Sequence, residues 1–233
     1  MQNENPAQSK PTIVFVHGLW ADGSCWNKVI AQLQAEGYKT ISAQNPTTTL
    51  ADDVMAVQHA LDRTSGPVIL VGHSWGGFVI TQFGKNERVK GLVYVAALAP
   101  DENETATALL EKAAPNQLAN FYVKHNGFVT LSEDGMMKAF AQDLPKKEQM
   151  IQFATQTPAG LAAFDNKSAA PAWKSLPSWY VLAKRDETVN PDLQRLMSKR
   201  MKAKVYEADS DHVVMLSHPD AVLKAIHDAA KGG

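Results

Sequence analysis

The sequence predicts an α/β fold, with a mostly parallel sheet of about six strands flanked by helices. Short runs rich in β-branched and aromatic residues alternate along the chain with segments of helical periodicity. Most of these runs are nearly continuous in apolar residues or bounded by Pro and Gly, as strands buried on both faces tend to be. With 233 residues and 45% hydrophobic content, the chain is long enough to bury one full core.

Six runs are the expected strands, and helical patterns separate them. The strands are expected at 12–17, 39–44, 67–72, 90–98, 177–183 and 203–208. The helices are expected at 24–36, 50–63, 75–86, 191–202 and 219–231. Because strands alternate with helices, the strands should run parallel, with helices on both faces of the sheet.

One long segment interrupts the alternation after the fourth strand. Residues 100–173 separate two expected strands where a short crossover would be enough, and they carry helical patterns at 105–120, 133–143 and 145–157. A structureless loop of this length is implausible in a compact protein. We therefore expect a helical cap at 100–173, inserted into a core formed by 1–99 and 174–233. Two extra helices packed on the side of the sheet are the alternative.

Composition excludes several classes of protein. The chain has 23 basic and 24 acidic residues, which indicates no nucleic acid and no anionic membrane surface as a partner. No apolar run approaches the roughly 18 to 20 residues that span a bilayer. The polar first eleven residues lack the features of a signal peptide. We expect a soluble protein, cytoplasmic as the sequence stands, or periplasmic or secreted if a signal peptide has been removed.

A serine surrounded by glycines is the strongest functional signal. In Gly72-His73-Ser74-Trp75-Gly76-Gly77, glycines stand two residues before and two and three residues after the serine, between an expected strand and an expected helix. A turn this sharp strains the central residue and brings backbones too close for side chains. It would raise Ser74 above the carboxyl end of the sheet as a nucleophile.

A nucleophilic serine needs a base, and the base needs an orienting carboxylate. Of the seven histidines, His212 fits best, because it directly follows the strand expected at 203–208. Asp186, four residues beyond the apolar run of the preceding strand, is the expected acid. Asp101, which also follows a strand, is the competing candidate. The alternative interpretation of Asp101 is that it caps a helix in the segment that follows it.

Two backbone N–H groups are expected to form an oxyanion hole. One belongs to Trp75, the residue after the nucleophile. The other belongs to Leu19, in the loop after the first strand, where His17-Gly18 lets the backbone turn inward. His17 itself reads as a buried structural histidine. The single cysteine, Cys25, rules out an internal disulfide and reads as a small buried residue.

With these parts in order, the sequence resembles an α/β-hydrolase, and within that superfamily the small plant methylesterase and hydroxynitrile lyase group with its bacterial esterase relatives. The resemblance covers nearly the whole chain from Pro11 and rests on "FVHGLWADGSCW", "VGHSWGGFVI", "LAKRDETVNPDLQ" and "SDHVVMLSHP". It implies a Ser74–His212–Asp186 triad, oxyanion donors at Leu19 and Trp75, and a cap between the fourth and fifth core strands.

The resemblance implies a serine carboxylesterase that acts on a small-molecule ester, without a metal or an organic cofactor. The lyases of the group carry threonine and lysine where this chain has Gly18 and Val213, so the pattern here is esterase-like. A hydrolase-fold receptor for a small apolar ligand is the alternative from another class, because one fold hosts many functions. We expect a monomer or homodimer.

Apolar side chains near the site predict an apolar acyl or alcohol group on the substrate. The residues expected to line the pocket are Trp20, Phe121, Met137, Phe140 and Met215.

Overall fold

The computed structural model describes residues 10–232. Its centre is a six-stranded parallel sheet in the order β2-β1-β3-β4-β8-β9. The predicted fold class is confirmed, and each expected strand is present within a few residues. The strands are β1 Thr12–Val16, β2 Thr40–Ala43, β3 Val68–His73, β4 Val89–Val95, β8 Ser178–Ala183 and β9 Lys204–Ala208.

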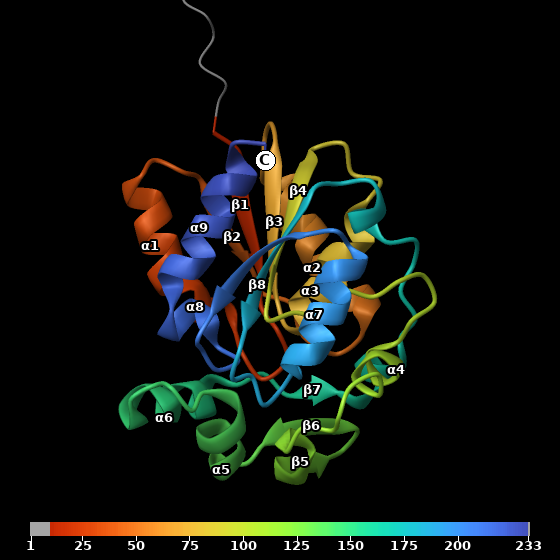
Figure 1. The fold of residues 1–233 in the computed structure, drawn as a ribbon, viewed down its shortest axis with the longest axis vertical. Coiled ribbons are helices and arrows are strands. Elements are labelled where there is room, and N and C mark those ends of the chain that lie inside the picture. The colour runs from red at the N-terminus through yellow and green to blue at the C-terminus, as the bar shows by residue number, and fades with distance from the viewer. Residues whose placement is uncertain (1–9, 233) are drawn as a thin grey trace, which may run out of the picture.

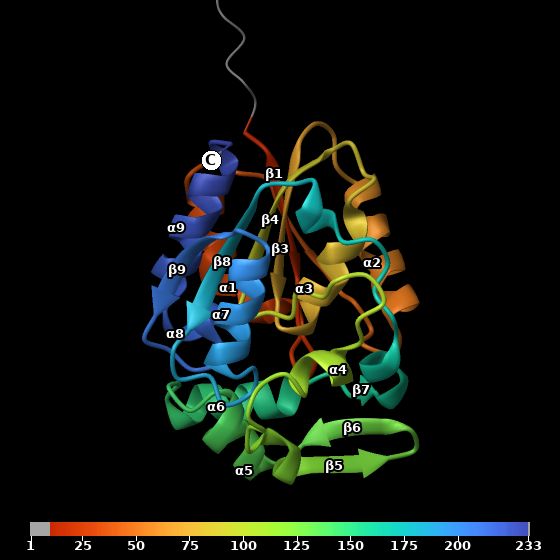
Figure 2. The ribbon, with the colours of Figure 1, turned by 45° about the vertical axis from the view of Figure 1, so that its right-hand side comes forward.

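Helices cover both faces of this sheet (Figure 1). One face carries α1 and α9, and the other carries α2, α3 and α7 (Figure 2). The central strands β1, β3 and β4 are apolar almost throughout because both of their faces are buried. The helices are α1 Asn27–Ala35, α2 Leu50–Asp62, α3 Trp75–Ile80, α7 Pro191–Arg200, α8 Val214–Ser217 and α9 Pro219–Ala230.

The segment 100–173 lies across the carboxyl ends of the core strands, at the lower end of Figures 1 and 2. It is only partly helical, which corrects the expectation of a helical cap. Beside its short helices it holds an antiparallel sheet in the order β5-β6-β7. Its elements are α4 Ala106–Leu110, β5 Tyr122–His125, β6 Phe128–Leu131, α5 Glu133–Gly135, a π-helix at Met136–Phe140, α6 Lys146–Thr155 and β7 Ala159–Gly160.

The differences from the expected helices have local causes. The helix expected at 105–120 ends at Leu110, and Pro115 disfavours helical backbone in the residue before it. Strands β5 and β6 are joined by Asn126-Gly127, with φ of 49° and 80°. Two positive φ values in a two-residue loop are what the tight hairpin turn requires, and Asn-Gly is its strongest sequence signal.

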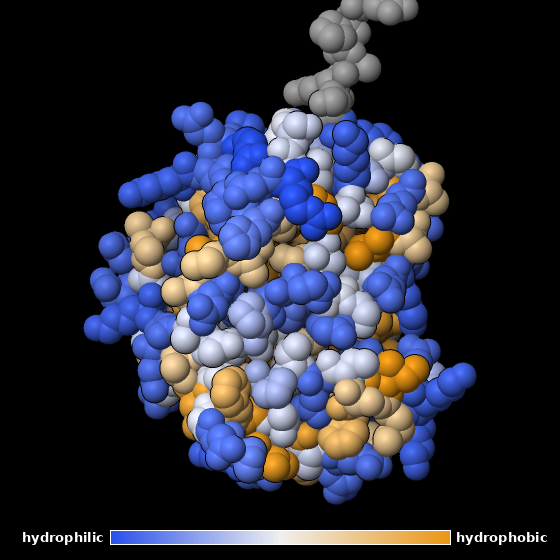
Figure 3. Space-filling model, turned by 180° about the vertical axis from the view of Figure 1, so that it is seen from behind, coloured by the Kyte–Doolittle hydropathy of each residue, from blue (hydrophilic) through white to orange (hydrophobic). Residues whose placement is uncertain are grey.

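Exposed apolar side chains are concentrated in this segment. The rear face of the molecule is mostly polar, and apolar side chains gather toward its lower end (Figure 3). Among the exposed large apolar residues, Val123, Phe128, Ile151 and Leu161 belong to the segment. In the core, by contrast, the side chain of Cys25 is fully buried beside β1, as expected.

Candidate active site

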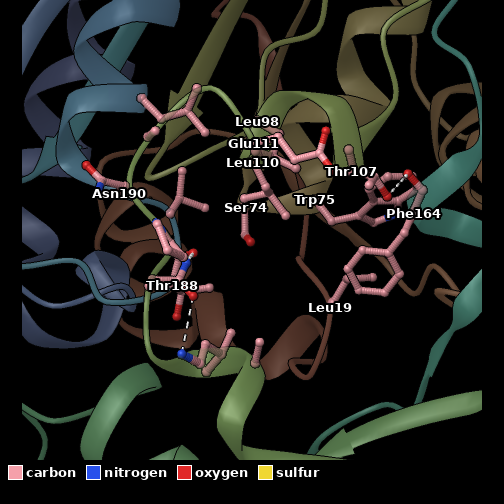
Figure 4. Close-up of a pocket in the computed structure, with 18 of the residues that line it drawn as sticks. Leu19, Ser74, Trp75, Leu98, Thr107, Leu110, Glu111, Phe164, Thr188 and Asn190 are labelled. Carbon is pink, nitrogen blue, oxygen red and sulfur yellow. Dashed lines mark hydrogen bonds between the residues drawn. The ribbon is translucent and has the colours of Figure 1, made fainter.

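Ser74 occupies a strained turn at the carboxyl end of β3. The strand ends at His73 and α3 begins at Trp75, so one residue joins them, with φ of 53° and ψ of −121°. A non-glycine residue with positive φ is uncommon and marks a constrained position. The serine side chain opens into a cavity beneath the turn (Figure 4).

The flanking glycines are required by close backbone packing. A Cβ on Gly72 would lie 2.5 Å from the carbonyl oxygen of Gly76. A Cβ on Gly76 would overlap the carbonyl oxygen of Val16, at the end of β1. The start of α3 can therefore pack closely against β3 and β1 only because these two positions have no side chain.

His212 and Asp186 form a buried pair. Nδ1 of His212 lies 2.8 Å from Oδ2 of Asp186. The same oxygen accepts a 2.8 Å hydrogen bond from the side chain of Gln194, while Oδ1 accepts from the backbone N–H groups of Thr188 and Val189 at 2.7 and 2.9 Å. With every acceptor direction on Asp186 occupied by a donor, Nδ1 of His212 carries the proton in this pair.

The second ring nitrogen of His212 is free. Within residues 10–232, Nε2 of His212 is buried without a hydrogen-bond partner. The ring lies beside His73, the residue before the serine, with ring centroids 4.5 Å apart. Nε2 of His73 donates to the carbonyl oxygen of His212 at 3.0 Å. The structure thus brings His212 to the strand end that carries Ser74, with an unprotonated nitrogen available there.

Two neighbouring histidines are held neutral. Burial lowers the pKa of His73 well below its usual value, and the nearby His212 adds to this effect. Burial also lowers the pKa of His17, whose Nδ1 lies 2.9 Å from the carbonyl oxygen of Gly18. Both side chains therefore act as uncharged supports, and His17 is the buried structural histidine that the sequence predicts.

Leu19 and Trp75 both line the cavity that Ser74 faces. Among the described residues, neither backbone N–H group donates a hydrogen bond to another element. Trp75 is the first residue of α3, where N–H groups point out of the helix without internal partners. Gly18 lies so close to the turn that a Cβ there would be 2.7 Å from Cβ of Ser74.

Hydrogen bonds from two indole groups hold the segments that carry these N–H groups against other elements. Trp20 has a positive φ of 58°, and its indole N–H donates to the carbonyl oxygen of Val129 in β6 at 2.9 Å. The indole N–H of Trp75 donates to buried Asp53 in α2 at 2.6 Å. Burial raises the pKa of Asp53 to about 6.

The cavity has a volume of about 520 Å³ and a largely apolar wall. Figure 4 shows Ser74 and Trp75 on one side and Leu19 and Phe164 on another. Most of the wall comes from the segment 106–122 and from residues 188–193 at the start of α7.

Of the five residues expected to line this pocket, the structure places only Trp20 in the wall. The prediction was wrong for the other four residues, because their side chains lie elsewhere. Phe140 and Met215 are fully buried, Phe121 packs against Gly135, and Met137 lies outside the wall. Phe140 is still close to the site, because its ring centroid lies 5.1 Å from that of His212.

A carboxylate from the inserted segment joins the loops that carry Asp186 and His212. Asp143 accepts two 2.8 Å hydrogen bonds from the guanidinium of Arg185, next to Asp186. It also accepts from the N–H of Asp211, next to His212, at 2.8 Å, and its own N–H donates back to Asp211 at 3.0 Å. Burial raises the pKa of Asp211 to about 6.

The competing acid, Asp101, lies elsewhere. Its carboxylate pairs with Lys174 at 2.5 Å and accepts from the N–H of Glu102 at 2.7 Å. Sequence reasoning missed Gln194 and Asp143. Gln194 stands on the buried face of α7, and a buried polar residue facing a strand end is the signal that could have identified it.

The residues that the structure describes contain neither a metal-binding cluster nor a membrane-spanning helix. No three His, Cys, Asp or Glu side chains in residues 10–232 come together as a metal-binding group. In the same range, no helix has the length and apolar character needed to cross a membrane.

Known proteins resemble this chain over nearly its whole length. A family model described as "Alpha/beta hydrolase family" matches residues 13–225. "Alpha/beta hydrolase nvfD" of Aspergillus novofumigatus is 24% identical, over 95% of this chain and 97% of its own. Methylesterase 2 of Arabidopsis thaliana is 26% identical, over 94% and 97%. The crystal structure of polyneuridine aldehyde esterase superposes with a TM-score of 0.84 at 20% identity, covering 95% of this chain and all of the other.

Proposed function

Because the chain belongs to the alpha/beta hydrolase family, we propose that it hydrolyses carboxylic esters, with Ser74 as nucleophile, His212 as base and Asp186 as orienting acid. The observation that carries this proposal is the 2.8 Å pair of His212 and Asp186, which leaves Nε2 of His212 without a partner, while the same ring lies against His73, the residue before the strained turn at Ser74. The esterases among its relatives support the reaction class.

In the first step, Nε2 of His212 takes the hydroxyl proton of Ser74 while the serine oxygen attacks the ester carbonyl carbon. The imidazolium that forms is stabilised by the carboxylate of Asp186. The proton then passes to the departing alkoxide, which leaves as the alcohol, and the acyl group stays on Ser74.

In the second step, His212 deprotonates a water molecule, which attacks the acyl carbon. The bond between this carbon and the oxygen of Ser74 then breaks, His212 returns the proton to that oxygen, and the acid is released. In both steps the former carbonyl oxygen becomes negatively charged in the tetrahedral intermediate, and it accepts hydrogen bonds from the N–H groups of Leu19 and Trp75. Such a donor lowers the barrier by about 3 to 4 kcal/mol in other enzymes.

The cavity favours a small substrate with a substantial apolar part. A volume of about 520 Å³ with a mostly apolar wall suits an organic ester of modest size. Val213, beside His212, is buried and uncharged, and a side chain at Gly18 would crowd Ser74. Both features favour ester cleavage over cyanohydrin cleavage, and we expect no cyanide release from mandelonitrile above background.

Substitution and covalent labelling of Ser74 test the proposal. A fluorophosphonate should add one mass to the peptide that contains Ser74, and Ser74→Ala should lower kcat for p-nitrophenyl acetate by about 10⁴ to 10⁶. Ser24→Ala, on an exposed turn, is the matched control and should retain activity and labelling. Labelling at another residue, or full activity in Ser74→Ala, would contradict the assignment.

A further inference from the structure

One charged residue lines the cavity. Among the residues of its wall, only Glu111 carries a formal charge. It directly follows α4, and Figure 4 shows it beside Leu110 at the edge of the cavity that Ser74 faces. Within residues 10–232, its carboxylate makes no hydrogen bond and no ion pair, although other acidic residues nearby, such as Glu104, are paired with basic residues.

Three other polar side chains of the wall already have hydrogen-bond partners within the protein. The hydroxyl of Thr107 donates to Asp165 at 2.9 Å, and the hydroxyl of Thr188 donates to the carbonyl oxygen of Ala139 at 2.9 Å. Asn190 accepts from the N–H of Asp192 at 2.8 Å. These groups have fewer directions left for a ligand, whereas both oxygens of Glu111 are available.

Aromatic rings line the same cavity. The ring of Trp20 lies 5.3 Å from that of Tyr122 and 6.4 Å from that of Phe164, measured between centroids. All three residues belong to the cavity wall. Burial raises the pKa of Tyr122 to about 12, and the face of a neutral aromatic ring carries partial negative charge.

A carboxylate and several aromatic faces in one apolar cavity form the environment in which organic ammonium groups bind. The carboxylate supplies the opposite charge, and the aromatic faces attract a cation through their quadrupoles. A neutral ester would fill the apolar space equally well but would leave Glu111 without a partner. An anionic ester would be repelled by it.

We propose that Glu111 gives the cavity a subsite for a positively charged substituent, so that its preferred substrates are esters bearing an organic ammonium group. The preference among ester substrates rests on the proposed esterase function, whereas the binding of an organic ammonium group does not. Because Glu111 is exposed to solvent, the expected preference is modest, roughly three- to tenfold, and it should weaken at high salt.

The kinetic test compares esters that differ only in charge. The probes are acetate esters of ω-trimethylammonio alcohols with two to four methylenes, each paired with its neutral tert-butyl counterpart of the same shape. The unmodified protein should show a kcat/KM for the best cationic ester roughly three- to tenfold above that of its neutral partner. Glu111→Gln should bring this ratio close to one, and Glu111→Lys should reverse it.

Glu133→Gln is the matched control, because it removes the same charge from an exposed position of the same segment outside the cavity wall. It should leave the ratio unchanged. A ratio near one in the unmodified protein, or a preference that persists in Glu111→Gln, would overturn the proposal.

A binding measurement separates this inference from the esterase proposal. Benzyltrimethylammonium and neutral neopentylbenzene have the same shape, and their binding to the Ser74→Ala variant can be followed by tryptophan fluorescence. Tighter binding of the cation that is lost on adding Glu111→Gln supports the subsite, even if no ester is hydrolysed. Equal affinity for the two compounds would reject the subsite, even if esters are hydrolysed readily.

Discussion

At the scale of single residues, the hydrogen bonds of Asp186 make a sharp prediction about tautomers. In Asp186→Asn, the amide oxygen should take the position of Oδ1, which receives two backbone N–H groups. The NH₂ group would then face Nδ1 of His212, which must become an acceptor and move its proton to Nε2. The base would lose the lone pair that it needs.

We therefore expect Asp186→Asn to lower kcat by about 10⁴, as in other triads, with little change in the melting temperature. Asp101→Asn is the matched control. Because Asp101 pairs with Lys174 on the surface, this variant should stay near the activity of the unmodified protein. A larger loss of kcat in Asp101→Asn than in Asp186→Asn would show that the acid has been misassigned. Both values follow from steady-state kinetics with p-nitrophenyl acetate.

At the scale of elements, the turn between β3 and α3 requires glycine at position 76 because the backbone packs closely against β1 there, and substitution tests this requirement. Gly76→Ala would push a methyl group into the end of β1, so the helix or the strand must move. We expect a loss of roughly 2 kcal/mol or more in unfolding free energy, together with loss of activity. Urea titration and kinetics measure the two effects.

Gly37→Ala is the comparison, because it introduces the strain of positive φ without any close packing, whereas Gly76 is closely packed but has no positive φ. Gly37 has φ of 81° and no atom within 4 Å of an added Cβ. This substitution should cost about 1 kcal/mol of stability and leave activity intact. Equal losses in the two variants would mean that close packing at Gly76 is unimportant.

The inserted segment also holds the loops of the acid and the base through Asp143. Removing its side chain in Asp143→Ala takes away the carboxylate that connects Arg185 to the N–H of Asp211, and Arg185 retains only its bonds to Asp209. The expected result is a fall in kcat of about ten- to a hundredfold with little change in KM, because small displacements of reacting groups are costly. Asp134→Ala, which breaks an exposed pair with Lys138 in the same segment, should change neither constant. A change confined to KM would place Asp143 in substrate binding instead.

The elements also show where sequence reasoning succeeds. Periodicity located the six core strands because continuous apolar runs between helical patterns have few other interpretations. The sharp turn at Ser74 between a strand and a helix was predictable, because the glycines on either side permit the close backbone packing that such a turn requires. The Asn126-Gly127 signal was present but was overlooked within a segment read as helical.

The pocket could not be predicted in the same way. Its wall is built from small and medium side chains of 106–122, whereas Phe140 and Met215 use their size to fill the core. A large apolar side chain is expected to be buried. Its size and apolarity do not show whether it faces the cavity or packs in the core behind the cavity wall. Contacts between distant segments, such as Asp143 with Arg185, leave no local pattern at all.

At the scale of the whole molecule, buried carboxylates shape the dependence of stability on pH. Burial raises the pKa of Asp53 to about 6 in the folded state, above the usual value of 3.8. The folded protein therefore binds more protons than the unfolded chain between these values, and the contribution of Asp53 to stability falls as pH rises from about 4 to 6.

The comparison of the unmodified protein with Asp53→Asn isolates this contribution. The difference in unfolding free energy should favour the unmodified protein more at pH 4 than at pH 7, by up to about 3 kcal/mol. Urea titrations across this range measure it, with Asp52→Asn as the control for loss of one charge from α2. A difference that does not vary with pH would mean that Asp53 is ionised as readily in the folded protein as in the unfolded chain.

The fully buried Cys25 makes the rate at which the protein core opens measurable. It is the only cysteine in the chain, and burial raises its thiol pKa well above the usual value, so the folded protein holds it both covered and protonated. An aromatic disulfide reagent can react with it only while the packing around β1 is open. At low reagent concentration the labelling rate reports the population of that open state, and at high concentration it reaches the rate of opening itself. The labelling rate of this one sulfur atom thus measures how often the centre of the molecule opens, without an engineered cysteine.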